Sequence, residues 1–87
     1  MKGKTKSGFE FDVEEIVLDD YRILKALNEV YDGNSGRIVY VINKLLGPEQ
    51  EEALMAHVEE LNDGKCSASG MAAELKDIFD GLKAKNS

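Results

Sequence analysis

The sequence has few of the residues that usually carry chemistry or cross-links. Its 87 residues include one cysteine (Cys66), one histidine (His57), one proline and no tryptophan. A lone cysteine cannot form a disulfide within the chain, and a zinc site needs at least about three ligands on converging elements. Cys66 has no adjacent histidine to act as its base, and His57 has no recognisable nucleophile to activate. We therefore expect no enzyme activity, no metal and no other cofactor.

Long apolar runs are absent as well. No stretch approaches the ~20 apolar residues that span a bilayer. The lysine-bearing start leads into no apolar segment of the kind that forms a secretion signal. Together with a single cysteine, which suits a reducing compartment, these features predict a cytoplasmic protein without a membrane partner.

Negative charge dominates what is present. The chain has 17 acidic and 11 basic residues, a formal net charge of −6. Five lysines lie before residue 7 or after residue 82, so residues 9–82 hold six basic against 17 acidic side chains, a net charge of −11. Such a surface repels phosphate backbones, which argues against a nucleic-acid partner. We expect flexible tails at 1–8 and 84–87 around a single domain at 9–83.

The acidic residues do not form a recognisable site. Adjacent pairs such as Glu51–Glu52 point about 100° apart on a helix, so a solvated face is the simpler interpretation. The loop at 32–36 resembles the start of a calcium-binding loop. The required glutamate at the twelfth position is Asn43 here, which excludes an EF-hand and leaves an ordinary turn between helices.

The first third of the chain combines two periodicities. Residues 9–13 alternate apolar and acidic side chains, which predicts an extended segment with one buried face. From Glu14 the apolar residues recur at intervals of three and four, which predicts an amphipathic helix with Asp12 as its N-cap. The stripe assigned to its buried side comprises Val17, Tyr21, Leu24, Leu27 and Tyr31, widened by Ile16, Ile23 and Val30.

The remaining chain divides into three further helical segments. Four β-branched residues within 38–42 favour a strand, but the run continues to Leu46, so we favour a central helix capped by Asn34 or Ser35. Gly47 suits the end of that helix and Pro48 the first position of the next, which extends to Leu61. A last helix is expected from near Ser67 or Ser69 to about Lys83. The predicted fold class is all-α, a small bundle of about four helices with a short extended N-terminal arm.

Three stretches of the chain resemble a known family. They are Ser7–Phe11 followed by Leu18–Asp20, then Leu45–Gln50 with Ala53-Leu54, then Glu74–Phe79. In these stretches the sequence is similar to the small tail assembly chaperones of siphophages and prophages of Gram-positive hosts. The resemblance implies a helical, non-enzymatic protein that coats the tape measure protein and keeps it soluble while the tail tube polymerises. It also implies self-association and a location in the host bacterial cytoplasm.

Two functions stay open on this basis. The first is a phage tail assembly chaperone that forms a homo-oligomer. Its partners would be the tape measure protein or other tail proteins. The alternative is a small virion structural protein, either a head-tail connector or a subunit associated with the tail tube. The candidate contact residues for protein partners are mostly aromatic or apolar: Phe9, Phe11, Tyr21, Tyr40, Leu46, Pro48, Met55 and Phe79.

Overall fold

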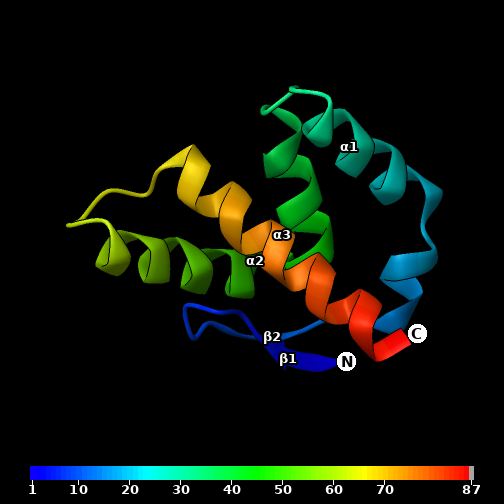
Figure 1. The fold of residues 1–87 in the computed structure, drawn as a ribbon, viewed down its shortest axis with the longest axis horizontal. Helices are drawn as coiled ribbons and strands as arrows, with labels where there is room; N and C mark the ends of the chain where they lie inside the picture. Colours follow the sequence, from blue (N-terminus) through cyan, green and yellow to red (C-terminus); the bar gives the residue numbers. More distant parts are fainter. Residues whose placement is uncertain (87) are drawn as a thin grey trace.

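The computed structural model describes residues 1–86, with side chains described for residues 1–83. Figure 1 shows a small hairpin lying beside the α-helices. In chain order the elements are strand β1 (Lys2–Lys4), strand β2 (Glu10–Asp12), 3-10 helix η1 (Glu15–Asp19), and helices α1 (Tyr21–Tyr31), α2 (Arg37–Leu61) and α3 (Ala68–Asn86). The expected mainly helical fold is confirmed at this level, but the described residues form three α-helices instead of four.

The bend within α2 accounts for the missing fourth helix. Gly47 has φ 79° and ψ 166°, a backbone conformation that is essentially restricted to glycine. Pro48 follows as the first residue of the second helical half, where its missing N–H leaves no bond unmade. The break lies where the sequence predicts it: non-helical Gly47 divides α2 into two helical halves, whose arms meet at a steep angle in Figure 1.

The Ile38–Ile42 stretch is helical, so the preference for helix over strand is confirmed. The expected side-chain cap is wrong, because Gly36 occupies the N-cap position and makes no side-chain cap bond. Asn34 and Ser35 instead accept the first helical N–H groups through their backbone carbonyls.

The N-terminal segment is the largest departure from the sequence-based expectation. Residues 1–8 were predicted as a flexible tail, yet Lys2–Lys4 pair antiparallel with Glu10–Asp12, and Gly3 lies opposite Phe11. Composition misled the prediction because lysine side chains project into water while their backbone groups pair. The extended character of residues 9–13 is confirmed for Glu10–Asp12.

Helix α1 also begins later than expected. Residues 15–19 form the 3-10 helix η1, and the N-cap of α1 is Asp20, whose carboxylate accepts a hydrogen bond from the Arg22 N–H (2.9 Å). Asp12, predicted as the cap, lies in β2. The buried side of α1 is formed by Ile23, Ala26 and Leu27. The prediction is correct for Leu27 and for Ile23, which widens the predicted stripe, but Tyr21, Leu24 and Tyr31 of the same stripe are exposed.

Helix α3 begins close to the predicted position, where Ser67 Oγ accepts a hydrogen bond from the Gly70 N–H (3.0 Å). It extends to Asn86, so the flexible tail predicted at 84–87 is helical up to that residue, and residue 87 lies outside the described part of the chain.

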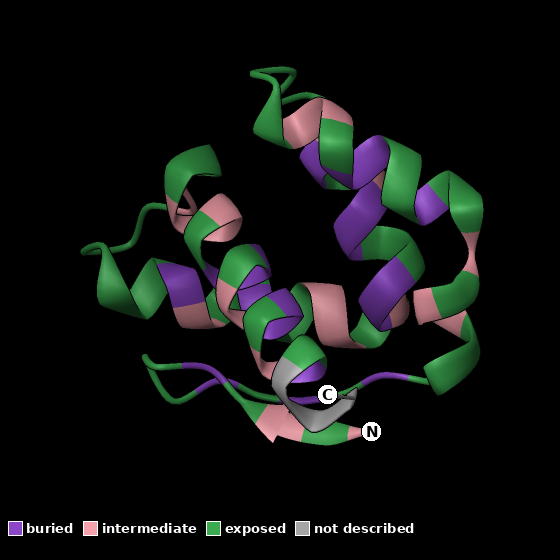
Figure 2. Ribbon diagram, turned by 45° about the vertical axis from the view of Figure 1, so that its right-hand side comes forward, coloured by how far each residue is buried: buried purple, intermediate pink, exposed green. Residues whose placement is uncertain are grey.

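One core holds these elements together. The buried faces of the three helices and of β2 turn inward in Figure 2. Its largest fully buried side chains come from both halves of α2 and from α3, joined by Val13 after the hairpin: Ile42, Leu54, Leu75, Ile78, Leu82, Val13, Val41 and Val58. None of the helices described is both long and apolar enough to cross a membrane.

Candidate binding surfaces

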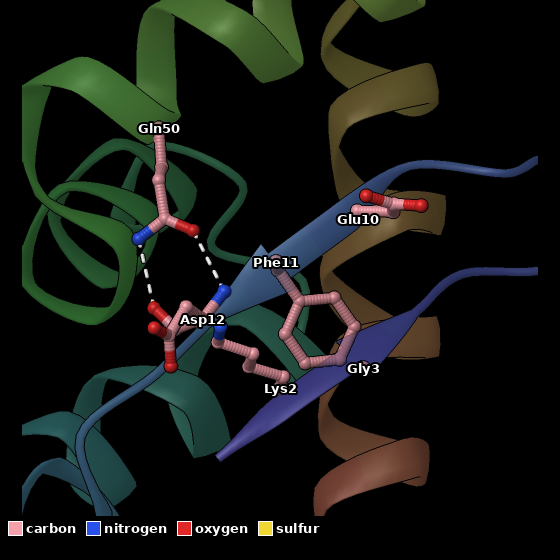
Figure 3. A pocket seen from close by; sticks show the side chains of 6 residues that line it. All are labelled: Lys2, Gly3, Glu10, Phe11, Asp12 and Gln50. Carbon is pink, nitrogen blue, oxygen red and sulfur yellow. Dashed lines mark hydrogen bonds between the residues drawn. The ribbon is translucent and has the colours of Figure 1, made fainter.

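Gln50 fixes the hairpin to the bend of α2 (Figure 3). The Asp12 N–H donates to Gln50 Oε1 (2.7 Å), and Gln50 Nε2 donates to the Asp12 carbonyl (2.8 Å). Gln50 thus occupies the outer edge of β2 as a third strand would. Gln50 Nε2 also donates to the carbonyl of Leu46, the residue before the Gly47 break (2.8 Å).

The Phe11 ring explains why a glycine stands opposite it in β1. Figure 3 shows the ring lying over Gly3. A Cβ on Gly3 would come within 2.5 Å of the ring, and Phe11 is buried and cannot move aside. The cross-strand pair therefore lets an aromatic ring cover the hairpin and pack into the core.

A polar cluster joins the hairpin turn to α2 and α3. Thr5 Oγ1 donates to Glu74 Oε1 (2.9 Å), and Ser7 Oγ donates to the same oxygen (2.7 Å). His57 Nε2 lies 2.9 Å from Ser7 Oγ, and the Phe9 ring stacks at a tilt on the imidazole. Thr5 and Glu74 are both buried. The cluster therefore satisfies a buried carboxylate with two hydroxyl donors.

The arrangement of Ser7, His57 and Glu74 differs from that of a nucleophile and its base. The Ser7 hydroxyl proton is directed at Glu74, so His57 Nε2 has to donate to Ser7 Oγ. A nitrogen that donates to the serine cannot also take its proton. Glu74 approaches the same Nε2 (3.8 Å), whereas the orienting acid of a triad contacts the opposite ring nitrogen. We interpret the cluster as the anchor of the hairpin.

An apolar groove opens where the two halves of α2 meet the start of α3. Its volume is about 310 Å³, at the lower end of the range for binding clefts. Most of its lining is aliphatic or sulfur-containing: Ser35, Ile38, Val39, Ile42, Glu51, Met55, Cys66, Ala68 and Met71. Val39 is 68% exposed and Met55 is 40% exposed. We call this feature the α2–α3 groove.

The border of the α2–α3 groove is acidic. Glu51 is the one charged residue in its lining. Glu52 and Glu59 flank Met55 on the other side, where the three residues line a neighbouring shallow depression. Apolar and flexible methionine side chains adapt to differently shaped partners, and the carboxylates favour a partner with positive charge next to its apolar surface.

The eight candidate contact residues are divided between core and surface. Four of them are buried and so offer no free surface: Phe9, Phe11, Leu46 and Phe79. Tyr40 is half-buried, with the Arg37 guanidinium 4.7 Å from its ring centroid. Tyr21, Pro48 and Met55 are exposed, but they lie on different parts of the surface, and of these only Met55 lines the α2–α3 groove.

Sequence reasoning did not single out Val39 or Met71 as groove residues. Both belong to apolar helical stretches that the sequence pattern assigns to the core, whereas the structure places them in the lining of the α2–α3 groove. The link from Glu74 to the hairpin hydroxyls was missed too, because its partners lie 67 and 69 residues away. A glutamate between apolar residues of α3 is the one local signal that could have indicated a buried carboxylate.

Comparisons with protein-family models, with curated proteins and with solved structures find no match to this chain.

Proposed function

We propose that this protein is a non-enzymatic assembly chaperone that holds apolar helical segments of a long client, and that the client is a phage tape measure protein. The family resemblance of the sequence suggests the client. The observation that carries the proposal is the α2–α3 groove, an apolar depression with exposed Met55 and Val39 and an acidic border.

The chemistry of the groove defines the client segment. An amphipathic helix laid in a groove is recognised through apolar residues at intervals of three and four. The aliphatic and methionine lining suits such an apolar stripe, and Glu51, Glu52 and Glu59 suit lysines or arginines beside it. The net charge of −6 keeps a chaperone–client assembly soluble after the apolar surfaces have met.

Co-expression with the tape measure protein of the same phage tests the proposal. We expect the tape measure protein to remain soluble and to co-purify with the chaperone. The double variant Val39→Glu/Met55→Glu places two charges in the groove at exposed positions, so it should fold and lose the client. Leu61→Glu, an equivalent change at an exposed apolar position outside the groove lining, is the matched control.

Loss of client solubility with both variants, or with neither, would contradict the assignment to the groove. Failure of the unsubstituted chain to bind or solubilise the tape measure protein would contradict the chaperone function. Mass spectrometry of purified virions addresses the alternative function of a head-tail connector or tube-associated subunit. A chaperone should be absent from finished particles, whereas a structural subunit should be present in stoichiometric amount.

A further inference from the structure

Helix α1 carries an apolar face that no other part of the described chain covers. Tyr21 is 76% exposed, Leu24 46% and Tyr31 57%. With the exposed Asn28 they occupy positions i, i+3, i+7 and i+10, which lie along one side of a helix. We call these four residues the α1 outer face. The buried side of α1, formed by Ile23, Ala26 and Leu27, is turned to the core.

The spacing of this face is symmetric about Ala26. Tyr21 and Tyr31 lie five residues before and after it, and Leu24 and Asn28 lie two residues before and after it. An isologous contact requires each residue to meet its counterpart across a two-fold axis. We propose that the α1 outer face binds the same face of a second copy of this chain, with the two α1 helices antiparallel. Each Tyr21 then meets a Tyr31, and each Leu24 an Asn28.

Charge supports the antiparallel direction. A second row lies one residue further along the helix, with the same spacing: Arg22, Lys25, Glu29 and Asp32. Its first two residues are basic and its last two acidic. In an antiparallel pair Arg22 is level with residue 30 of the second copy, next to Glu29 and near Asp32. A parallel pair would instead align like charges, which is unfavourable.

The intrachain ion pairs leave these charges available. Arg22 approaches Asp20 (3.5 Å) and Glu29 approaches Arg37 (3.6 Å), but the side chains concerned are at least about a third exposed. Ion pairs of this kind contribute little and exchange partners readily.

The balance of charge favours a second copy over the client as the occupant. The row beside the α1 outer face contains two residues of each sign, whereas the charged residues in and beside the α2–α3 groove, Glu51, Glu52 and Glu59, are all acidic. Charged residues can attract one another across a self-contact only if both signs lie on the one surface. The inference is therefore independent of the proposed function and concerns a different surface.

The area of the face sets the strength of the contact. Aromatic side chains bury about 150–250 Å² each, so the exposed parts of two tyrosines and one leucine offer roughly 300–400 Å² per copy. Stable interfaces bury about 800 Å² per partner, and smaller ones are usually transient. We therefore expect a dimer that forms only at high protein concentration.

Sedimentation equilibrium over a concentration series measures this association. The average mass should rise from one chain toward two, and Leu24→Glu should weaken association at least tenfold because it places charges near the two-fold axis. Leu61→Glu, an equally polar change at an exposed leucine outside α1, should leave association unchanged. Circular dichroism establishes that each variant is folded.

A charge exchange tests the direction of the helices. The variant Arg22→Glu/Lys25→Glu and the variant Glu29→Lys/Asp32→Lys should each remain monomeric, because each carries one sign along the row. Mixed together, they should form a one-to-one dimer. A chain that is monomeric at every concentration, or a dimer insensitive to Leu24→Glu, would overturn the proposal. Variants that fail to pair on mixing would overturn the antiparallel arrangement.

Discussion

Substitution of Gln50 by methionine tests how the hairpin is attached to the helices. The change keeps the length of the side chain and removes its three hydrogen bonds, two to the Asp12 backbone and one to the Leu46 carbonyl. Asp12 then has an edge N–H and carbonyl open to water, and the Leu46 carbonyl loses its side-chain donor beside the helix break.

The expected loss in the free energy of unfolding depends on the number of these hydrogen bonds and on their exposure to water. A hydrogen bond contributes about 0.5–1.5 kcal/mol net, so three together give at most about 4.5 kcal/mol. The two bonds to Asp12 are exposed, and water replaces much of what is lost there. We expect a decrease of about 1–2 kcal/mol in the free energy of unfolding, or about 5–15 °C in melting temperature for a domain of this size.

Urea denaturation measures the global effect, and amide hydrogen exchange measures the local one. Exchange of the Asp12 N–H should accelerate in Gln50→Met, because this group loses its acceptor. Glu52→Met, at an exposed position in the same half of α2, is the control and should leave Asp12 exchange unchanged. A Gln50→Met protein with unchanged stability and unchanged Asp12 exchange would refute the inferred role of Gln50.

Two further substitutions test the bent helix and the core. Gly47→Ala forces a side chain into a glycine-specific conformation and should reduce the free energy of unfolding by about 1–3 kcal/mol; a melting temperature equal to that of the unsubstituted chain would show that the bend adapts freely. Leu45→Asp places a carboxylate in the core without a partner and should cost several kcal/mol; cooperative unfolding at an unchanged urea midpoint would mean that Leu45 is not a core residue.

The break in α2 was readable from the sequence because its cause is local. Gly47 and Pro48 restrict their own backbone whatever surrounds them. The N-terminal hairpin was not readable in the same way. Its first strand has three residues, two of them lysines, and it gains stability from the Phe11 ring over Gly3 and from Glu74 on α3.

The two candidate surfaces also depend on tertiary contacts that the sequence pattern does not reveal. Tyr21 and Leu24 were assigned to the core because helical spacing fixes which residues share a face, yet spacing alone leaves open which face meets the rest of the protein. Around α1 two apolar rows compete, and Ala26, whose small side chain permits close packing, lies in the row that is buried. Val39 and Met55 lie sixteen positions apart in the sequence, and the bend in α2 brings them together in the α2–α3 groove.

The sequence by itself determined the helical class, the acidic surface and the break at Gly47-Pro48, because these depend on side-chain type, charge and the allowed dihedral angles of single residues. Tertiary structure alone decided that the lysine-rich start pairs as a strand, that Glu74 is buried among hydroxyl donors, and which face of α1 remains open. These outcomes depend on contacts between residues distant in the chain, whose free energies no local pattern contains.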